Sequence, residues 1–189
     1  HLKGWMQPKS VPTNLVNLPS SSFTIQEPLG VVCIIAPWNY PFQLLFTPLI
    51  GAIAGGNCAV LKPSEFAPAT AAVMGKMIAD LFPNNYMLYL EGEGATVLPP
   101  LLTENRFDHI FYTGSTMVGK IIYKLAAEQL VPVTLELGGK SPAVICSDAN
   151  LRVAARRLAN PKFSNCGQMC IAPDYILVPH ALKDALIKE

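Results

Sequence analysis

The segment from Asn165 to Cys170 (NCGQMC) ends in a cysteine, a residue type that can act as a nucleophile toward a carbonyl carbon. The reactive form is the thiolate, and because sulfur also leaves readily, a cysteine can carry an acyl group through a reaction cycle. An isolated cysteine in an apolar chain is more often a small buried hydrophobic residue. The hexapeptide by itself leaves both interpretations of Cys170 open.

Glu136 is a carboxylate within the otherwise apolar end of a predicted strand, in the segment Val133 to Lys140 (VTLELGGK). Removing a carboxylate from water is costly, so we expect Glu136 either to pair with a cation or to take up a proton readily, as a general base does. The segment alone is equally consistent with a structural charge and with a catalytic base.

A candidate phosphate-binding turn lies in the segment Phe111 to Gly119 (FYTGSTMVG), where strand-like residues pass into a predicted helix. Helix N-termini bind phosphate with free N–H groups and the positive end of the helix dipole. The segment lacks the Gly-x-Gly-x-x-Gly fingerprint, because Thr116 stands at the position of the middle glycine. A simple N-cap by Ser115 is the alternative interpretation.

Two further polar turns follow predicted strands, where open α/β sheets bind ligands. In the first, Lys62 and Glu65 provide a cation and an acid that can both reach a nucleotide ribose; the alternative is a surface ion pair, with Ser64 as an N-cap. In the second, from Pro37 to Pro41, a rigid turn can aim the Asn39 amide at a developing oxyanion. Asn39 can equally close an Asx turn.

These residues need a scaffold, and the hydrophobic pattern predicts one of alternating strands and helices. The uncharged run Leu29 to Ala36 (LGVVCIIA) suits a parallel strand buried on both faces. Pro41 favours a helix start, and Gly55-Gly56 can end that helix before the next strand. The alternation predicts an α/β fold with a doubly wound, mostly parallel sheet. We expect strands at 29–36, 58–61, 87–90 and 109–112, and helices at 42–54, 68–81, 95–103 and 115–127.

A domain hinge is predicted at Gly138-Gly139, directly after the segment that holds Glu136. Residues 1–137 would then form one domain, and residues 138–189 would form the truncated start of a second α/β domain. For the second part we expect a strand at 143–146, a helix from Asn150, a strand at 175–178 and a helix at 181–189.

Composition indicates a folded protein whose partner is a small molecule. Of the 189 residues 51% are hydrophobic, and 14 Lys and Arg nearly balance 13 Asp and Glu, with no block of like charges to attract a nucleic acid. Five unevenly spaced cysteines favour reduced thiols, so we expect a cytoplasmic setting. Prolines and glycines interrupt the uncharged run from Pro28 to Leu61, which argues against a membrane-spanning helix.

Five segments together resemble the aldehyde dehydrogenase superfamily in their order and approximate spacing. The chain most resembles the class 3 branch, particularly in EPLGVV at 27–32, in Ser141-Pro142 and in APDYI at 172–176. Met169 departs from the pattern, because relatives often carry Thr there; we expect a reshaped substrate pocket and an intact thiol. The five segments are APWNYPF (36–42), LKPSE (61–65), YTGSTMVG (112–119), LELGGK (135–140) and NCGQMC (165–170).

The resemblance implies oxidation of an aldehyde to a carboxylic acid, with a Rossmann-like NAD(P)-binding domain over residues 1–137. Cys170 is the implied nucleophile, and the Asn39 amide with the Cys170 N–H would hold the oxyanion. Hydride transfer to the cofactor leaves a thioester, which a water activated by Glu136 hydrolyses. No metal is implied. The implied cofactor-binding residues are Trp38, Lys62, Glu65, Gly114, Ser115, Thr116, Gly119, Leu137 and Gly138, and Tyr40 is implied at the substrate.

Three other functions remain open at this point. A related enzyme passes the thioester to coenzyme A, although Glu136 favours water as the acceptor. A thiol hydrolase without redox chemistry needs a partner base, and the three histidines have no recognisable context for that role. The third alternative is a binding or structural module.

The resemblance also sets expectations about cofactor, substrate and assembly. Glu65 should repel a 2′-phosphate and favour NAD, whereas nearby Lys62 weakens this argument, so NADP stays open. Apolar residues around Tyr40 favour medium- or long-chain aliphatic or aromatic aldehydes. The segment from Ser10 to Gln26 resembles the family's intersubunit arm and predicts a homodimer. Because the family's chains are longer, we expect a fragment cut at both ends, with a membrane-anchoring tail still open beyond Glu189.

Overall fold

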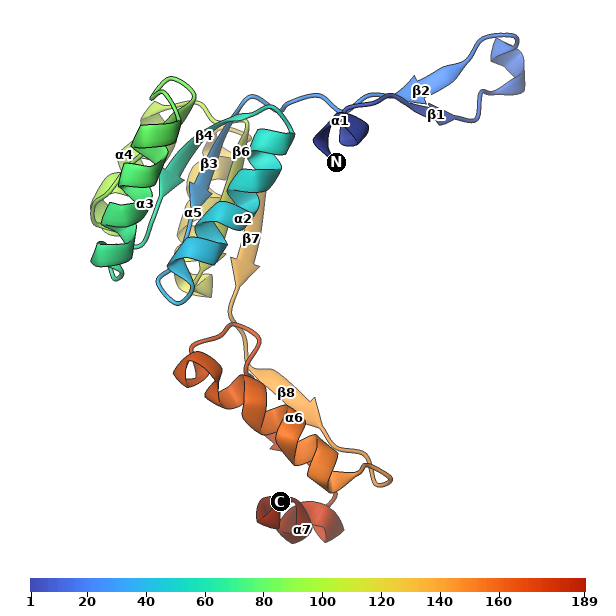
Figure 1. The fold of residues 1–189 in the computed structure, drawn as a ribbon, viewed down its shortest axis with the longest axis vertical. Helices are drawn as coiled ribbons and strands as arrows, with labels where there is room; N and C mark the ends of the chain where they lie inside the picture. The colour runs from blue at the N-terminus through green and yellow to red at the C-terminus, as the bar shows by residue number, and fades with distance from the viewer.

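The computed structural model describes residues 1–189, and its central element is a five-stranded parallel sheet (Figure 1). The strands lie in the order β5-β4-β3-β6-β7. Along the chain, the sheet therefore begins at its middle strand β3 and is extended to one edge by β4 and β5. It is then extended to the other edge by β6 and β7, which places the topological switch between β3 and β6. The strands are β3 (Val31–Ile35), β4 (Cys58–Lys62), β5 (Met87–Tyr89), β6 (His109–Gly114) and β7 (Val133–Leu137).

Helices cover both faces of this sheet (Figure 1). α2 (Pro41–Ala54) and α3 (Pro68–Leu81) pack on one face, and α4 (Gly94–Glu104) and α5 (Thr116–Glu128) pack on the other. Successive residues of β3 alternate between the two cores, because Ile34 lies with α2 and α3 whereas Cys33 lies with α4 and α5. The predicted doubly wound α/β fold is thus confirmed.

Proline places the starts of two helices, as the sequence indicated. Pro41 and Pro68 lie at the first positions of α2 and α3, where a missing N–H costs nothing. The uncharged run from Pro28 to Leu61 forms β3, the 14-residue α2 and most of β4. No helix of the structure combines the length and apolar character needed to cross a bilayer.

Residues 138–189 lie beyond the end of β7 and form a smaller unit (Figure 1). Here β8 (Ser141–Val144) pairs in parallel with β9 (Pro173–Leu177), and α6 (Leu151–Phe163) connects them, with α7 (Lys183–Lys188) packed against α6. The predicted strand at 143–146 was wrong by two residues at each end. The strand begins at Ser141 because its partner β9 begins at Pro173, which lies opposite Ser141.

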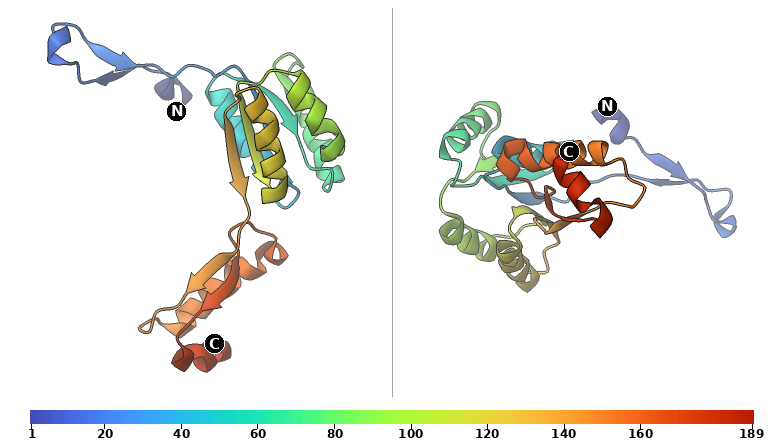
Figure 2. Two further views of the ribbon diagram at one scale, coloured as in Figure 1. Left: turned by 180° about the vertical axis from the view of Figure 1, so that it is seen from behind. Right: turned by 90° about the horizontal axis from the view of Figure 1, so that it is seen from below.

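The N-terminal residues project away from the sheet as an arm (Figure 2). A short helix, α1 (Leu2–Trp5), precedes an antiparallel hairpin of β1 (Lys9–Val11) and β2 (Ser22–Thr24). No residue from 1 to 27 is buried, and at the tip Leu15 and Val16 are 82% and 87% exposed.

Candidate active site

The polar turns singled out in the sequence meet at one edge of the five-stranded sheet. All five strands are parallel, so the segments that follow β3, β4, β6 and β7 leave the sheet at the same edge. Those that follow β3 and β6 flank the topological switch, the usual ligand crevice of open α/β sheets. The tertiary structure therefore gathers the turns at 37–40, 63–65 and 114–116 and the glycine pair 138–139.

The turn between β6 and α5 has the features of a phosphate site and also contains the N-cap that was its alternative. Ser115 Oγ accepts a hydrogen bond from the Val118 N–H at 3.3 Å. The N–H groups of the first turn have no acceptor inside a helix, so those of Thr116 and Met117 remain for an anion. The Ser115 cap is therefore compatible with the predicted phosphate site at the start of α5.

Gly114 and Gly119 have a steric reason for being glycine. A side chain at Gly114 would collide with the hydroxyl of Tyr112, which donates a hydrogen bond to the Ser115 carbonyl oxygen at 3.2 Å. A Cβ at Gly119 would lie 2.9 Å from a Leu137 methyl carbon. The two glycines therefore let α5 begin close against β6 and β7. Burial raises the pKa of Tyr112, which keeps its hydroxyl protonated as a donor.

Lys62 and Glu65 form an ion pair with an Nζ–Oε2 distance of 3.2 Å. Lys62 is buried, its Nζ also donates to the Pro63 carbonyl oxygen, and Glu65 Oε1 accepts from the Gly94 N–H at 2.8 Å. Partial burial alone would raise the pKa of Glu65, but the hydrogen bonds from Gly94 and Lys62 outweigh it and lower this pKa. Glu65 is therefore held as an anion at the end of β4.

The alternative interpretation of Ser64 as a helix N-cap is wrong. Ser64 does not cap α3, whose N-cap is Ala67 without a side-chain hydrogen bond. Its hydroxyl instead accepts a hydrogen bond from the Phe66 N–H at 3.3 Å, which shapes the turn that presents Glu65.

Asn39 and the loop that carries Cys170 are joined by two hydrogen bonds. Asn39 Nδ2 donates to the Gln168 carbonyl oxygen at 2.9 Å, and Asn165 Nδ2 donates to the Asn39 carbonyl oxygen at 2.9 Å. No backbone N–H donates to Asn39 Oδ1, so Asn39 does not close an Asx turn. Its amide N–H groups lie beside the loop of the candidate nucleophile, more than 120 residues away in the sequence.

Cys170 is exposed, which argues against the small buried residue that was its alternative interpretation. Cys33 supplies the contrast within the same chain, because it is fully buried in β3 and burial raises the pKa of its thiol to about 12. Cys166 is also exposed, on the same loop. Exposure is one of the conditions that a reactive cysteine requires.

The burial expected for Glu136 was wrong. Glu136 is exposed on β7, opposite Thr113 of β6, and it forms neither an ion pair nor a side-chain hydrogen bond with the rest of the chain. β7 is an edge strand, so one side of it has no neighbouring strand to shield this carboxylate. Glu136 is accessible to water, and the chain contains no cation that pairs with it.

The remaining predicted residues lie around the same edge. Trp38 is 46% exposed, Tyr40 is half-buried at the start of α2, and Leu137 pairs with Gly114 at the ends of β7 and β6. Gly138 has open space around it.

The contacts of three site residues had not been anticipated from the sequence. Asn165, Gln168 and Gly94 bind Asn39 or Glu65 through hydrogen bonds to partners at least 29 residues away. The signal for Asn165 was local, because asparagine directly before Cys-Gly suits a left-handed turn. No comparable signal identifies a Gly94 N–H or a Gln168 carbonyl oxygen.

Comparison with known proteins identifies the family. The sequence pattern of the Aldehyde dehydrogenase family matches residues 5–189. A 4,4'-diaponeurosporen-aldehyde dehydrogenase from Staphylococcus aureus is 52% identical over 186 residues, which are 98% of this chain and 40% of that protein. Aldehyde dehydrogenase family 3 member A2 from Macaca fascicularis is 46% identical over 99% of this chain and 38% of its own length. The chain thus spans about two-fifths of these relatives.

Solved structures agree with this result. A substrate-bound Staphylococcus aureus AldH superposes with a TM-score of 0.95 at 51% identity, over 99% of this chain and 40% of that one. A betaine aldehyde dehydrogenase from the same organism, in complex with NAD+, gives 0.84 at 32% identity over 96% of this chain and 36% of its own. An NADP-dependent glyceraldehyde-3-phosphate dehydrogenase from Bacillus halodurans, complexed with NADP, gives 0.86 at 31% over 97% and 39%. With its family pattern, its relatives and its fold in agreement, this chain belongs to the aldehyde dehydrogenase family.

Proposed function

We propose that this chain is part of an enzyme that oxidises an aldehyde to a carboxylic acid with NAD(P)+, through a thioester on Cys170. The observation that carries the proposal is the pair of hydrogen bonds between Asn39 and the Cys170 loop. These bonds join an amide donor, which does not titrate, to the loop that also carries an exposed thiol. That combination suits attack on a carbonyl group whose oxygen becomes negatively charged.

The residues at the sheet edge fit a dinucleotide. The start of α5 offers N–H groups for a pyrophosphate, and the Tyr112 hydroxyl fills the space that a side chain at Gly114 would need. The Glu65 carboxylate has lone pairs beyond those used by Gly94 and Lys62 and can accept hydrogen bonds from ribose hydroxyls. Trp38, Leu137 and Gly138 would line the nicotinamide end. When bound, the nicotinamide supplies a hydride acceptor.

The chain's own residues supply the acyl chemistry. The Cys170 thiolate attacks the aldehyde carbon, and the oxygen of the tetrahedral adduct accepts hydrogen bonds from the Asn39 amide and the Cys170 N–H. An amide has two N–H donors, so the bond to Gln168 leaves one for this oxygen. After oxidation, Glu136 takes a proton from a water that attacks the thioester. The exposure of Glu136 suits this step because the carboxylate has direct access to water.

The structure supports NAD more than NADP. Glu65 is held as an anion by Gly94 and Lys62, and a fixed negative charge at the end of β4 opposes a 2′-phosphate. Solved relatives include one with NAD+ and one with NADP, so the family accommodates both. Lys62 is buried and paired with Glu65, which leaves its charge less available to a 2′-phosphate.

The expected aldehyde is apolar. Trp38 directly precedes Asn39 in the sequence and Phe42 follows three residues later; they are 46% and 51% exposed, and the Phe42 ring stacks on Phe46 with centroids 4.5 Å apart. Large apolar side chains beside the oxyanion donor favour an aliphatic or aromatic substrate.

Domains and assembly follow the same proposal. Residues 1–137 would be the cofactor-binding domain and 138–189 the first part of the catalytic domain. The arm at 10–26 exposes Leu15, Val16 and Phe23 and would contact a second copy in a homodimer.

The test uses an enzyme that contains this chain at the full length of its relatives. Cys170→Ala removes the nucleophile, so neither a first turnover nor steady NADH formation is expected. Glu136→Gln keeps the shape and removes the base, so it should release one NADH per site in a burst and then stall. Its steady rate should fall by about 10²- to 10⁴-fold, the usual contribution of a positioned general base. Rapid mixing with absorbance detection separates the burst from the steady rate.

Cys166→Ala is the matched control, because it removes the other exposed thiol of the loop and should retain a substantial rate. Steady NADH formation by Cys170→Ala contradicts the proposal. A slowed burst in Glu136→Gln, restored in part at higher pH, assigns Glu136 to activation of Cys170 instead. Rate acceleration by coenzyme A together with acyl-CoA formation would replace water as the acceptor.

A further inference from the structure

The loop that carries Cys170 contains three consecutive residues with left-handed backbone. Asn165, Cys166 and Gly167 have φ values of +47°, +56° and +76°. Glycine adopts such angles freely and asparagine tolerates them, whereas other L residues do so at a cost. A turn of this kind persists only where surrounding contacts hold it.

The contacts that hold this turn come partly from the loop itself and partly from the turn after β3 that carries Asn39. Within the loop, the Gln168 N–H donates to the Asn165 carbonyl oxygen at 3.0 Å, and the Met169 N–H donates to the Gly167 carbonyl oxygen at 2.9 Å. From outside the loop, the Asn39 carbonyl oxygen accepts a hydrogen bond from Asn165 Nδ2 at 2.9 Å. This last bond is the one that an external element supplies to the left-handed residues.

A second hydrogen bond between the Asn39 turn and the loop closes a ring. Asn39 Nδ2 donates to the Gln168 carbonyl oxygen, so the Asn39 backbone receives a bond from the loop and the Asn39 side chain gives one back. A single bond would fix only a distance. Two bonds at separate points of both segments also fix the orientation of the Asn39 amide relative to the loop.

We propose that Asn165 is a positioning residue for the proposed aldehyde oxidation, on which this inference rests. Its side chain holds the Cys170 loop in register with Asn39, so that thiol and amide face the same carbonyl group. Asn165 itself contacts neither substrate nor cofactor in this role. The choice of asparagine follows from two demands, a left-handed backbone and a side-chain donor directed at a carbonyl oxygen.

The primary test is Asn165→Gly in an enzyme that contains this chain at the full length of its relatives. Glycine accepts the positive φ, so the change removes the donor and keeps the turn. We expect kcat to fall by about 10- to 100-fold, as small misplacements of reacting groups do. The KM for NAD+ should stay within about twofold, because Lys62, Glu65 and α5 are untouched.

Cys166→Gly is the matched control. It makes the same change of backbone freedom one residue later and leaves the Asn165 donor in place. We expect its kcat to stay within about threefold of the parent. If Asn165→Gly fails to fold by thermal melting, Asn165→Asp replaces it, because ionised aspartate tolerates the turn but cannot donate.

A double variant separates positioning from general stability. Asn39→Ala keeps the backbone carbonyl that Asn165 binds and removes the oxyanion donor. If Asn165 acts by orienting this donor, adding Asn165→Gly to Asn39→Ala should cost little further rate.

Three results overturn the inference: a parent-like kcat for Asn165→Gly, losses that multiply in the double variant, or an NAD+ KM that rises with the fall in kcat. Activity in Cys170→Ala would instead overturn the proposed function. If Cys170→Ala is inactive and Asn165→Gly has the kcat of the parent enzyme, only the positioning role of Asn165 is refuted.

Discussion

The candidate site combines residues from two regions that differ greatly in the number of buried residues behind them. The turns that bear Asn39, Glu65 and Ser115 extend from a five-stranded sheet with helices on both faces, and its buried residues form two hydrophobic clusters. Cys170 lies on a loop between α6 and β9, within a two-stranded unit in which only Ile145, Ala172 and Leu186 are buried. Sheets need about three strands or a packed helix for independent stability, and the second unit is near that limit.

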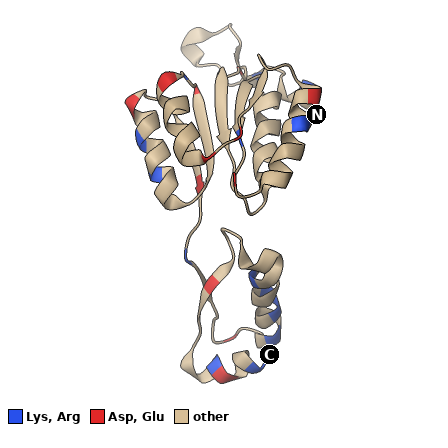
Figure 3. Ribbon diagram, turned by 90° about the vertical axis from the view of Figure 1, so that its left-hand side faces the viewer, with Lys and Arg blue, Asp and Glu red and all other residues tan.

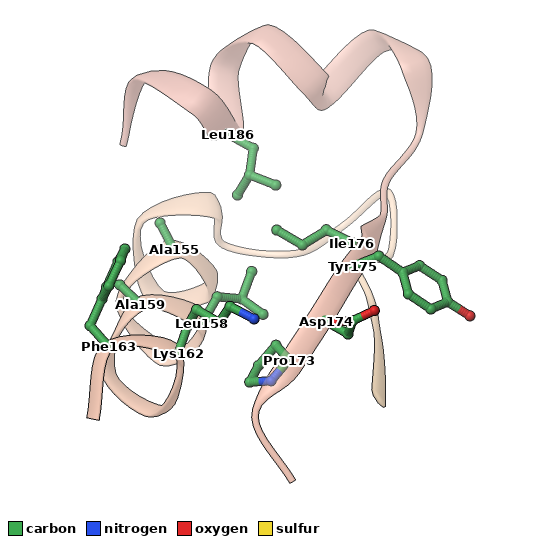
Figure 4. A pocket seen from close by; sticks show the side chains of 10 residues that line it. All are labelled: Ala155, Leu158, Ala159, Lys162, Phe163, Pro173, Asp174, Tyr175, Ile176 and Leu186. Atoms are coloured by element: carbon green, nitrogen blue, oxygen red, sulfur yellow. The ribbon is translucent and has the colours of Figure 1, made fainter. Parts of the chain in front are cut away.

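The smaller unit also leaves apolar surface open. A groove of about 320 Å³ runs between α6, β9 and α7, with Leu158, Ile176 and Leu186 in its wall and Lys162 and Asp174 near one end (Figure 4). Basic residues are spread along α6, whereas the helices around the larger sheet carry few charges (Figure 3). The loop that carries Cys170, the proposed nucleophile, thus has little core of its own and is joined by two hydrogen bonds to Asn39, in the turn after β3.

The largest expected effect concerns the 189-residue chain produced alone. With so few buried residues behind the Cys170 loop, we expect no measurable steady NADH formation from an apolar aldehyde, because reacting groups must be held to within a fraction of an ångström. Absorbance of NADH at saturating NAD+ is the measurement. Sustained turnover by this chain would show that the smaller unit is as well supported as the sheet.

Truncation of matched leucines compares the two cores directly. Leu45 of α2 is fully buried in the core on that face of the sheet, so Leu45→Ala should destabilise the larger unit by about 2–5 kcal/mol. Leu158 of α6 is half-buried beside the open groove, so Leu158→Ala should cost about 1 kcal/mol or less. Urea unfolding followed by circular dichroism gives both values. Equal losses of unfolding free energy in the two variants would contradict the proposed difference in packing between the two regions.

The preference for NAD over NADP tests the proposed role of Glu65 at the end of β4. Glu65→Gln removes the charge that opposes a 2′-phosphate, so the preference for NAD over NADP should narrow by about tenfold, or ~1.4 kcal/mol. The measurement is the ratio of kcat/KM for the two cofactors in an enzyme of full length. Glu91→Gln removes a nearby exposed carboxylate and should change the ratio less. An unchanged ratio for Glu65→Gln would make its ion pair with Lys62 purely structural.

The smallest expected effect is a pH dependence confined to the larger sheet. Partial burial lowers the pKa of His109 in β6, where its Nε2 lies 2.9 Å from Thr134 Oγ1. The unfolded chain therefore binds a proton first as pH falls below about 6.5, and stability declines until the folded pKa is reached. His109→Gln should flatten this decline in thermal melts, whereas His180→Gln, an exposed change in the smaller unit, should leave it intact.

Local signals in the sequence determined the helices and most of the strands. A proline at the first helical position is a local signal, and it marks the start of both α2 and α3. The bounds of these two helices therefore followed from the sequence. The family resemblance likewise rested on short segments. Each of them survives as a turn or strand end in the structure.

The tertiary structure decided how these segments meet. The exposure of Glu136 depends on β7 being an edge strand, and the start of β8 depends on its register with β9. The bond from Asn165 to Asn39 spans 126 residues. Local spacing determines which backbone a segment adopts, but only the packing of strands and helices determines which distant donor finds which acceptor.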